Sequence, residues 1–410
     1  MNLNQGKCSR KMKVIFTTIG YYPEFGGVEN SLKYLSKETN NLGFRPIVVA
    51  AQSEKIEYKR VTRIDGIPVV RFRFRPFKSK VLNFFFLPFS FLDILFIFRK
   101  INQKKSVRLS INRNQFTSFF ATLVFKRNVY LAPGFARFQA TPSMLNEKAS
   151  GVKKTLFHIK AIIHNWFDKL ALLRSDKVFL FSENMKRQAR SVLLPHEYRS
   201  SNFQITKPGV DLDNFFPVNE SVKKTLRKSL NLPEDRILIL SVGRFVSAKG
   251  FSYLAASAEY LPDNASIVIV GDGPQRGDLL EVHKGLIEKK ILILPGKSVD
   301  TSKYYQASDV FVLSSVYEPL GQTLLEAAAC GLPIISFRNS SESGVVNATY
   351  EIFESNAFYS IEKSSSGLAM AINNYLDLEK EAKISISEST RSIVEKKCSW
   401  RTLAKELLDV

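Results

Sequence analysis

The stretch SSVYEPLGQTLLEAAACGLPII, residues 314–335, decides the fold of the second half of the chain. An apolar run ends near Ser314, a helix of small residues is predicted from Gly321, and a buried strand follows it. The first turn of such a helix presents backbone N–H groups without intrahelical partners, and the helix dipole adds partial positive charge there. Gly321, Gln322 and Thr323 are therefore predicted to form a phosphate-binding turn.

Two glutamates flank this turn. Glu326 lies about 7.5 Å along the helix axis from Gly321, which is close to the distance from a diphosphate to a ribose. A carboxylate there can accept hydrogen bonds from both ribose hydroxyls. Glu318 precedes the helix and can reach the other side of the diphosphate, where a transferred sugar would lie. The alternative is that both glutamates are ordinary surface charges.

Two cations follow an earlier apolar run. In VGRFVSAKG, residues 242–250, Arg244 and Lys249 come after a predicted strand, and Gly243 and Gly250 allow a tight backbone. Such cations can hold a diphosphate and stabilise the charge that develops when it leaves. Solvated loop cations are the alternative explanation.

The next motif, IVIVGDGPQRG, only partly matches a dinucleotide fingerprint. Its glycines are misplaced, and no acid ends the following strand. A nicotinamide site is therefore weakly supported.

Apolar runs alternate with helix-length segments along the chain, which predicts parallel sheets covered by helices on both faces. We expect an α/β protein with two Rossmann-like, doubly wound domains facing a central cleft, because ligands bind beyond the carboxyl ends of parallel strands. The runs are 14–19, 46–50, 107–111, 128–132 and 178–182, then 237–242, 266–270, 291–294, 310–314 and 332–336.

The domain boundary is expected near Pro208, Gly209 and Pro217, which interrupt the periodicity. The expected parts are a first domain that binds the acceptor and faces a membrane, a second domain that binds the donor, and terminal helices that could pack back on the first domain. These parts cover residues 1–207, 208–383 and 384–410.

The positive charge lies in the first half of the chain. Residues 1–200 carry 36 Lys and Arg against 12 Asp and Glu, or +24, whereas residues 201–410 carry 23 against 26, or −3. This asymmetry predicts an anionic partner for the first half, such as nucleic acid, an acidic membrane surface or a charged substrate.

An aromatic segment, VLNFFFLPFSFLDILFIFRK at residues 81–100, favours the membrane surface. Pro88 and Asp93 inside it argue against a membrane-spanning helix. With its basic flanks, segment 71–105 is typical of a helix lying on an anionic membrane. A core helix with solvated ends is the alternative. The flanking cations are Arg71, Arg73, Arg75, Lys78, Lys80, Arg99, Lys100, Lys104 and Lys105.

Cys8, Cys330 and Cys398 are far apart and form no C-x-x-C pair, which favours a reducing compartment without disulfides or zinc. The short apolar run after Lys13 predicts a buried first strand rather than a secretion signal. We therefore expect a cytoplasmic protein, peripheral on the inner face of the membrane.

Five motifs occur in a familiar order between Lys13 and about Phe337: GGVENSLKYLSKE, PGVDLDNFFP, VGRFVSAKG, VGDGP and YEPLGQTLLEAAACGLPII. Together they resemble family 4 glycosyltransferases, retaining enzymes with the GT-B fold and a Glu-seven-Glu motif. The resemblance implies transfer of a sugar from a nucleotide-sugar to a glycan or lipid-linked acceptor, as in cell-surface polysaccharide synthesis.

The resemblance also implies residue roles. Gly26 and Gly27, after the first strand, would approach the donor phosphates or the acceptor with bare backbone, although a simple turn would explain them too. The implied catalytic residues are Glu318, Arg244 and Lys249, and the implied donor-binding residues are Gly26, Gly27, Gly243, Gly321, Gln322, Thr323 and Glu326.

Family 4 enzymes use no essential metal, so no metal and no cofactor are expected. The D-x-D at Asp211 and Asp213 is attributed to the linker between the domains. Many relatives carry a histidine where NVYLAPGFARF has Ala132, Pro133 and Gly134, so the resemblance does not predict the donor sugar.

Two other functions remain open. A nucleic-acid-binding protein could use the basic half on phosphates, but no known reader motif is present and the aromatic residues are clustered rather than interleaved with cations. We therefore expect no nucleic-acid partner. An epimerase or phosphorylase on the same architecture is the second alternative.

Overall fold

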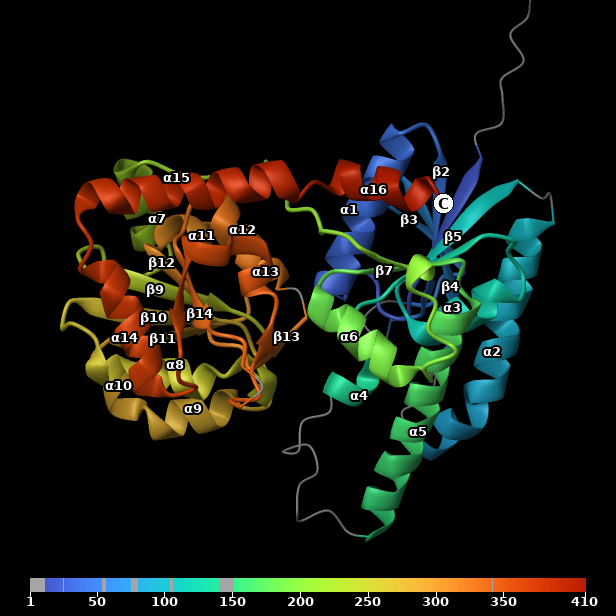
Figure 1. Cartoon of the computed structure of the whole chain (residues 1–410), viewed down its shortest axis with the longest axis horizontal. Helices are drawn as coiled ribbons and strands as arrows, with labels where there is room; N and C mark the ends of the chain where they lie inside the picture. The colour runs from blue at the N-terminus through green and yellow to red at the C-terminus, as the bar shows by residue number, and fades with distance from the viewer. Residues whose placement is uncertain are drawn as a thin grey trace, which may run out of the picture.

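The computed structural model describes residues 12–24, 26–53, 57–74, 80–103, 106–139, 151–319, 321–340 and 342–410. The chain forms two α/β lobes that lie side by side, each built on its own sheet (Figure 1). All the runs predicted as strands overlap strands of these sheets. The predicted fold class is confirmed.

The first lobe contains an 8-stranded sheet of order β3-β4-β2-β1-β5-β6-β7-β8, parallel except for the edge pair β3 and β4. Buried apolar residues fill its central strands, as expected when helices cover both faces. The strands are β1 (Lys13–Thr17), β2 (Arg45–Ala51), β3 (Val61–Ile64), β4 (Ile67–Phe72), β5 (Val107–Asn112), β6 (Asn128–Leu131), β7 (Lys177–Leu180) and β8 (Phe203–Ile205).

The second lobe contains a 6-stranded sheet of order β11-β10-β9-β12-β14-β16, which is the strand order of a Rossmann fold. The order reverses between β9 and β12, where such sheets bind ligands. The strands are β9 (Ile237–Val242), β10 (Ala265–Val270), β11 (Leu292–Gly296), β12 (Val310–Leu313), β14 (Ile334–Phe337) and β16 (Ala357–Ser360); β13 (Tyr317–Glu318) and β15 (Val346–Asn347) pair separately.

Helices cover the sheets of both lobes (Figure 1). Those of the first lobe are α1 (Gly27–Asn41), α2 (Lys80–Asn102), α3 (Gln115–Thr122), α4 (Ala136–Gln139), α5 (Gly151–Arg174) and α6 (Glu183–Val192). The second lobe has α7 (Glu220–Ser229), α8 (Phe251–Ser257), α9 (Arg276–Val282), α10 (Lys284–Glu288), α11 (Ser302–Ala307), α12 (Gln322–Ala329), α13 (Thr349–Phe353), α14 (Ser365–Leu376) and α15 (Lys380–Lys397). Short 3-10 turns are η2 (Ser200–Asn202), η3 (Ser247–Lys249), η4 (Ala258–Tyr260) and η5 (Glu354–Asn356).

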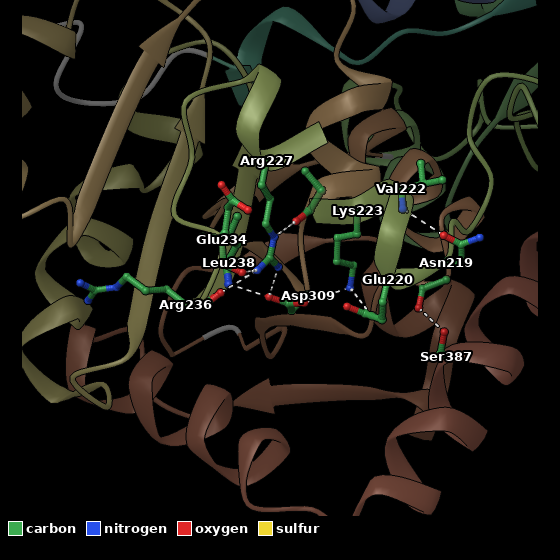
Figure 2. Close-up of polar contacts among 12 residues, drawn as sticks. Asn219, Glu220, Val222, Lys223, Arg227, Glu234, Arg236, Leu238, Asp309 and Ser387 are labelled. Atoms are coloured by element: carbon green, nitrogen blue, oxygen red, sulfur yellow. Dashed lines mark hydrogen bonds and ion pairs between the residues drawn. The ribbon is translucent and has the colours of Figure 1, made fainter. Parts of the chain in front are cut away.

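Helix α7 follows the linker and is fixed to the second sheet through Asp309, immediately before β12 (Figure 2). The Asp309 carboxylate accepts hydrogen bonds from Arg227 at 2.6 Å, Lys223 at 3.0 Å and the Leu238 backbone N–H at 2.7 Å. Arg227 is buried and also donates to the carbonyls of Ala307, Glu234 and Arg236. This network anchors the start of the second lobe.

The chain crosses between the lobes a second time, after α15. Helix α16 (Trp400–Leu408) packs on α1 of the first lobe, whereas α15 lies on α12 of the second (Figure 1). The Trp400 ring stacks on Tyr34 at 5.5 Å and lies directly on Gly209, where a β-carbon would be 2.3 Å from the Trp400 backbone nitrogen. Because Gly209 has no side chain, the linker between the lobes can contact the start of α16 at Trp400.

The basic aromatic segment forms α2. No helix among the described residues is long and apolar enough to cross a bilayer. One face of α2 nevertheless exposes Phe89, Leu92 and Phe96, each at least 60% accessible. Arg99 and Lys100 are exposed at its end.

The flanks of α2 need one correction. Arg71 was counted among the surface cations, but it is buried and donates to the carbonyls of Ala51 and Tyr22. It ties β4 to the end of β2 and to the loop after β1, and it offers no charge to a membrane. Asp93 pairs with Arg60 at 2.7 Å. Arg75, Lys78, Lys104 and Lys105 lie outside the described residues, as does Cys8.

The two lobes also touch through side chains of the second lobe. The Glu351 carboxylate accepts hydrogen bonds from the backbone N–H groups of Glu183 at 2.7 Å and Asn184 at 3.3 Å, in the first turn of α6. Tyr317 donates to Gln188 on the same helix at 3.2 Å. A carboxylate at a helix N-terminus is favoured by the dipole, so these contacts hold the lobes together.

Candidate active site

The predicted phosphate-binding turn lies where β12 ends and α12 begins. Gly321 precedes α12 in the left-handed region, with φ of 79°, which a residue with a side chain adopts only at a cost. This conformation turns the chain sharply, so the amino terminus of α12 points beyond the carboxyl ends of the second sheet. Cys330 and Cys398, both buried and free of disulfides, lie outside this turn.

Glu318 and Lys249 meet at this turn. The Lys249 ammonium group donates to Glu318 Oε2, and the Gly321 backbone N–H donates to Glu318 Oε1 at 3.2 Å. Ser314 ties the two loops together by donating to the Lys249 carbonyl at 2.9 Å. The structure thus joins a predicted acid, a predicted cation and the helix amino terminus in one contact.

The loop after β9 carries the other predicted cation. A β-carbon at Gly243 would lie 3.3 Å from Lys249 Cε, so this glycine leaves room for the lysine stem. Arg244 is exposed, and its guanidinium group has no polar partner among the described residues. The structure therefore brings Gly243 to Lys249 but does not join Arg244 to Glu318.

Gln322 and Thr323 begin α12 with different roles. Gln322 donates to the Gly209 carbonyl at 3.0 Å and so ties α12 to the linker. The Thr323 hydroxyl is buried and has no hydrogen-bond partner among the described residues. Its hydrogen-bonding capacity is therefore unused within the described part of the chain.

Glu326 lies further along α12, beside α11. Tyr305 donates to Glu326 Oε2 at 2.9 Å. Burial of the carboxyl group, with a smaller repulsion from Asp211, raises the pKa of Glu326 to about 7, and the hydrogen bond from Tyr305 opposes this shift. The residue keeps part of its surface accessible. Glu326 is a desolvated carboxyl group at the edge of the site, which is often found in binding sites.

The first lobe contributes the loop before α1. A β-carbon at Gly27 would lie 4.0 Å from Gln322 Cβ, so the loop faces the start of α12. A β-carbon at Gly26 would lie 2.5 Å from Glu29 Oε2. The end of the Glu29 side chain therefore lies against Gly26, and Glu29 is a carboxylate that the sequence analysis did not single out.

Tyr305 and Asp211 were also missed as neighbours of the site. Asp211 accepts hydrogen bonds from Tyr34 at 2.6 Å and from Asn214 Nδ2 at 2.5 Å, so it stabilises the linker and α1. Among the described residues, no group of three or more His, Cys, Asp or Glu side chains could hold a metal ion. The sequence indicated Tyr305 only through its position shortly before β12, the strand that leads to the site.

One histidine of the first lobe packs between two of its helices. His164, on α5, lies 3.0 Å from Gln115 through Nδ1 and packs its ring against Phe116. This pairing fixes α5 on α3, away from the turn that begins α12.

Residues 222–392 match the family model of glycosyl transferases group 1. The match contains the second-lobe residues of the site. The uncharacterized glycosyltransferase MJ1607 of Methanocaldococcus jannaschii is 28% identical over 246 residues, which are 59% of this chain and 61% of that protein. The lipopolysaccharide core biosynthesis glycosyltransferase LpsE of Rhizobium meliloti is 37% identical over 113 residues, which are 28% of this chain and 33% of LpsE.

The chain therefore aligns with less than two thirds of the length of either relative. A solved structure of Anabaena HepE in complex with UDP-glucose superposes with a TM-score of 0.71 over 97% of this chain and 98% of HepE, at 16% identity. The chain has the GT-B fold.

Proposed function

We propose that the chain is a retaining glycosyltransferase of family 4 that moves a sugar from a nucleotide-sugar to a glycan or lipid-linked acceptor. The observation that carries this proposal is the meeting of Glu318, Lys249 and the amino terminus of α12 at the carboxyl end of the second sheet. The family match over residues 222–392 and the UDP-glucose bound by HepE support a nucleotide-sugar donor.

In this proposal the donor diphosphate lies at the start of α12. The backbone N–H groups there, the Thr323 hydroxyl, Lys249 and Arg244 bind its oxygens and stabilise the charge that develops as it leaves. Glu326 accepts hydrogen bonds from the ribose hydroxyls. Glu318 then binds sugar hydroxyls.

The transfer step exchanges two bonds at the anomeric carbon. The bond to the leaving diphosphate breaks, and the acceptor oxygen bonds to the same face of the sugar. The leaving phosphate oxygen takes the acceptor proton, so no protein base is required. Closure of the lobes, aided by the Glu351 contact, excludes water that would otherwise compete with the acceptor.

The acceptor proposal rests on the first lobe. Residues 1–200 carry +24, and α2 exposes Phe89, Leu92 and Phe96 beside Arg99 and Lys100. Exposed apolar residues beside cations suit the surface of an anionic membrane. We place the protein on the cytoplasmic face of the membrane, where it extends a lipid-linked surface glycan.

The test is a screen of radiolabelled UDP-, GDP- and other nucleotide-sugars with membrane extracts as acceptors. We expect labelled product that needs both the donor and the extract, with the anomeric configuration retained. An epimerase or phosphorylase would instead change the donor without an added acceptor, and inversion would contradict the retaining mechanism.

Two variants test whether donor turnover depends on the candidate site. Glu326→Ala and Arg244→Ala should each reduce donor turnover at least a hundredfold, because each removes a contact to the leaving nucleotide. Binding to anionic liposomes should be unchanged, since α2 is untouched. Normal turnover in both variants would refute the site.

A further inference from the structure

Tyr305 is a buried tyrosine whose hydroxyl has one hydrogen-bond partner among the described residues. It is fully buried on α11, where its ring packs against Phe215 at 5.5 Å and Phe311 at 5.8 Å. Phenylalanine would fill the same space. The hydroxyl donates to Glu326 Oε2 at 2.9 Å, and a buried tyrosine hydroxyl is costly unless it is bonded.

The groups around Glu326 disfavour its ionised form. Asp211 from the linker repels it. Burial is the main cause of the raised pKa values of Tyr34 on α1 and of Cys330 directly after α12, and repulsion from Glu326 adds to both. From α15, Arg391 donates to the Ala329 carbonyl and to Glu395. Tyr305 is therefore the described side chain that donates a hydrogen bond to Glu326.

We propose that Tyr305 is a positioning residue for donor binding, which holds Glu326 by one oxygen, leaves the other oxygen for the ribose, and sets the pH range in which the donor binds. This inference rests on the proposed role of Glu326. Tyr305 itself touches neither donor nor acceptor in this scheme.

The direction of the pH effect follows from the hydrogen bond. Burial raises the pKa of Glu326 to about 7, while the bond from Tyr305 stabilises the carboxylate and lowers that pKa. Below this pKa the carboxyl group is protonated and is a poorer acceptor for two ribose hydroxyls. Donor affinity should therefore rise with pH through about 7, and loss of the Tyr305 hydroxyl should move this rise to higher pH.

The experiment compares the wild-type chain with Tyr305→Phe. Binding of uridine and guanosine diphosphates is measured by calorimetry from pH 6 to 9, using the nucleotide that the wild type binds more tightly. For Tyr305→Phe we expect affinity to fall about fivefold at pH 7 and to recover largely at pH 9, with the midpoint about one unit higher. In turnover assays KM should rise more than kcat falls.

Tyr304→Phe is the matched control. Tyr304 is buried on the same helix, but no hydrogen bond joins it to Glu326 among the described residues. Its replacement should leave the affinity and the pH midpoint unchanged. A midpoint that does not move in Tyr305→Phe, or that moves equally in Tyr304→Phe, would overturn the inference.

Glu326→Gln separates this inference from the proposed function. It should weaken nucleotide binding at pH 8 and abolish the pH midpoint, whether or not Tyr305→Phe folds. If Glu326→Gln binds like the wild type, the proposed donor site is wrong. If Glu326→Gln weakens binding while Tyr305→Phe does not, only the role of Tyr305 is refuted.

Discussion

At the scale of single residues, the main feature is that two predicted site residues of opposite charge, Lys249 and Glu318, form an ion pair with each other. Glu318 lies against the N–H of Gly321 and the ammonium group of Lys249, both of which we assign to the donor diphosphate. The pair is only 15–20% exposed, so solvent screens it less than a surface pair. A diphosphate must therefore displace the Glu318 carboxylate before the glutamate can bind the sugar.

We predict that Glu318→Gln separates binding from transfer. Without the carboxylate, Lys249 and the start of α12 should bind a nucleoside diphosphate about tenfold more tightly, because a charge-assisted contact no longer competes. Sugar transfer should nevertheless fall steeply. Calorimetry with UDP or GDP and a turnover assay check both effects, and Glu281→Gln, an exposed acid on α9, is the control. Weaker nucleotide binding in Glu318→Gln would show that the acid does not block this position.

At the scale of elements, α2 combines two surfaces. Ile94, Ile97 and Phe98 are buried against the first lobe, whereas Phe89, Leu92 and Phe96 face outward. The buried set fixes the helix to the lobe, so the outward set costs little to change. This division allows membrane contact to be tested without unfolding the lobe.

We predict that the triple variant Phe89→Ser, Leu92→Ser and Phe96→Ser binds anionic vesicles at least tenfold more weakly, because each exposed apolar side chain loses about 1 kcal/mol or more of burial in lipid. Nucleotide binding and thermal stability should change little. Vesicle sedimentation measures the effect. The control is Val282→Ser, Val299→Ser and Ile361→Ser, which changes side chains 73–85% exposed on the second lobe. Equal losses in both triples would contradict a specific role for α2.

At the scale of the whole molecule, one contact between the lobes joins a carboxylate of the second lobe to the start of a helix of the first. Glu351 binds the first turn of α6, yet α6 has its own cap because Ser182 accepts a hydrogen bond from Met185 N at 3.2 Å. The helix therefore does not need Glu351 to form. The contact of Glu351 with α6 therefore stabilises the association of the two lobes rather than the helix itself.

We predict that Glu351→Ala shifts the molecule toward an open form. Loss of hydrogen bonds to a charged group should lower the ratio of closed to open molecules roughly tenfold. Single-molecule energy transfer between dyes on the two lobes would measure it, with Glu342→Ala, an exposed acid of the second lobe, as the control. An unchanged distribution would mean that Glu351 does not stabilise closure.

Much of the architecture was predictable because strands buried on both faces appear as continuous apolar runs. The hairpin of β3 and β4 was missed, although its turn, Asp65 and Gly66 with φ of 47° and 78°, is a known hairpin signature. The burial of Arg71 depends on carbonyls from distant segments, which no local pattern encodes.

The candidate site was predictable in its positions but not in its contacts. Spacing and motif order placed Glu318 and Lys249 in the site, but their direct pairing across 69 residues follows only from the fold. The bond from Tyr305 to Glu326 likewise joins two helices.

The return of the chain to the first lobe at α16 affects the order in which the lobes can fold during synthesis. Trp400, Leu403 and Leu407 belong to the apolar core of the first lobe, yet a ribosome adds them after every strand of the second sheet. The nascent first lobe must therefore wait, with the surface that α16 later covers still open, until synthesis has passed the second lobe. Chaperones that shield apolar surface would have their longest opportunity at that stage.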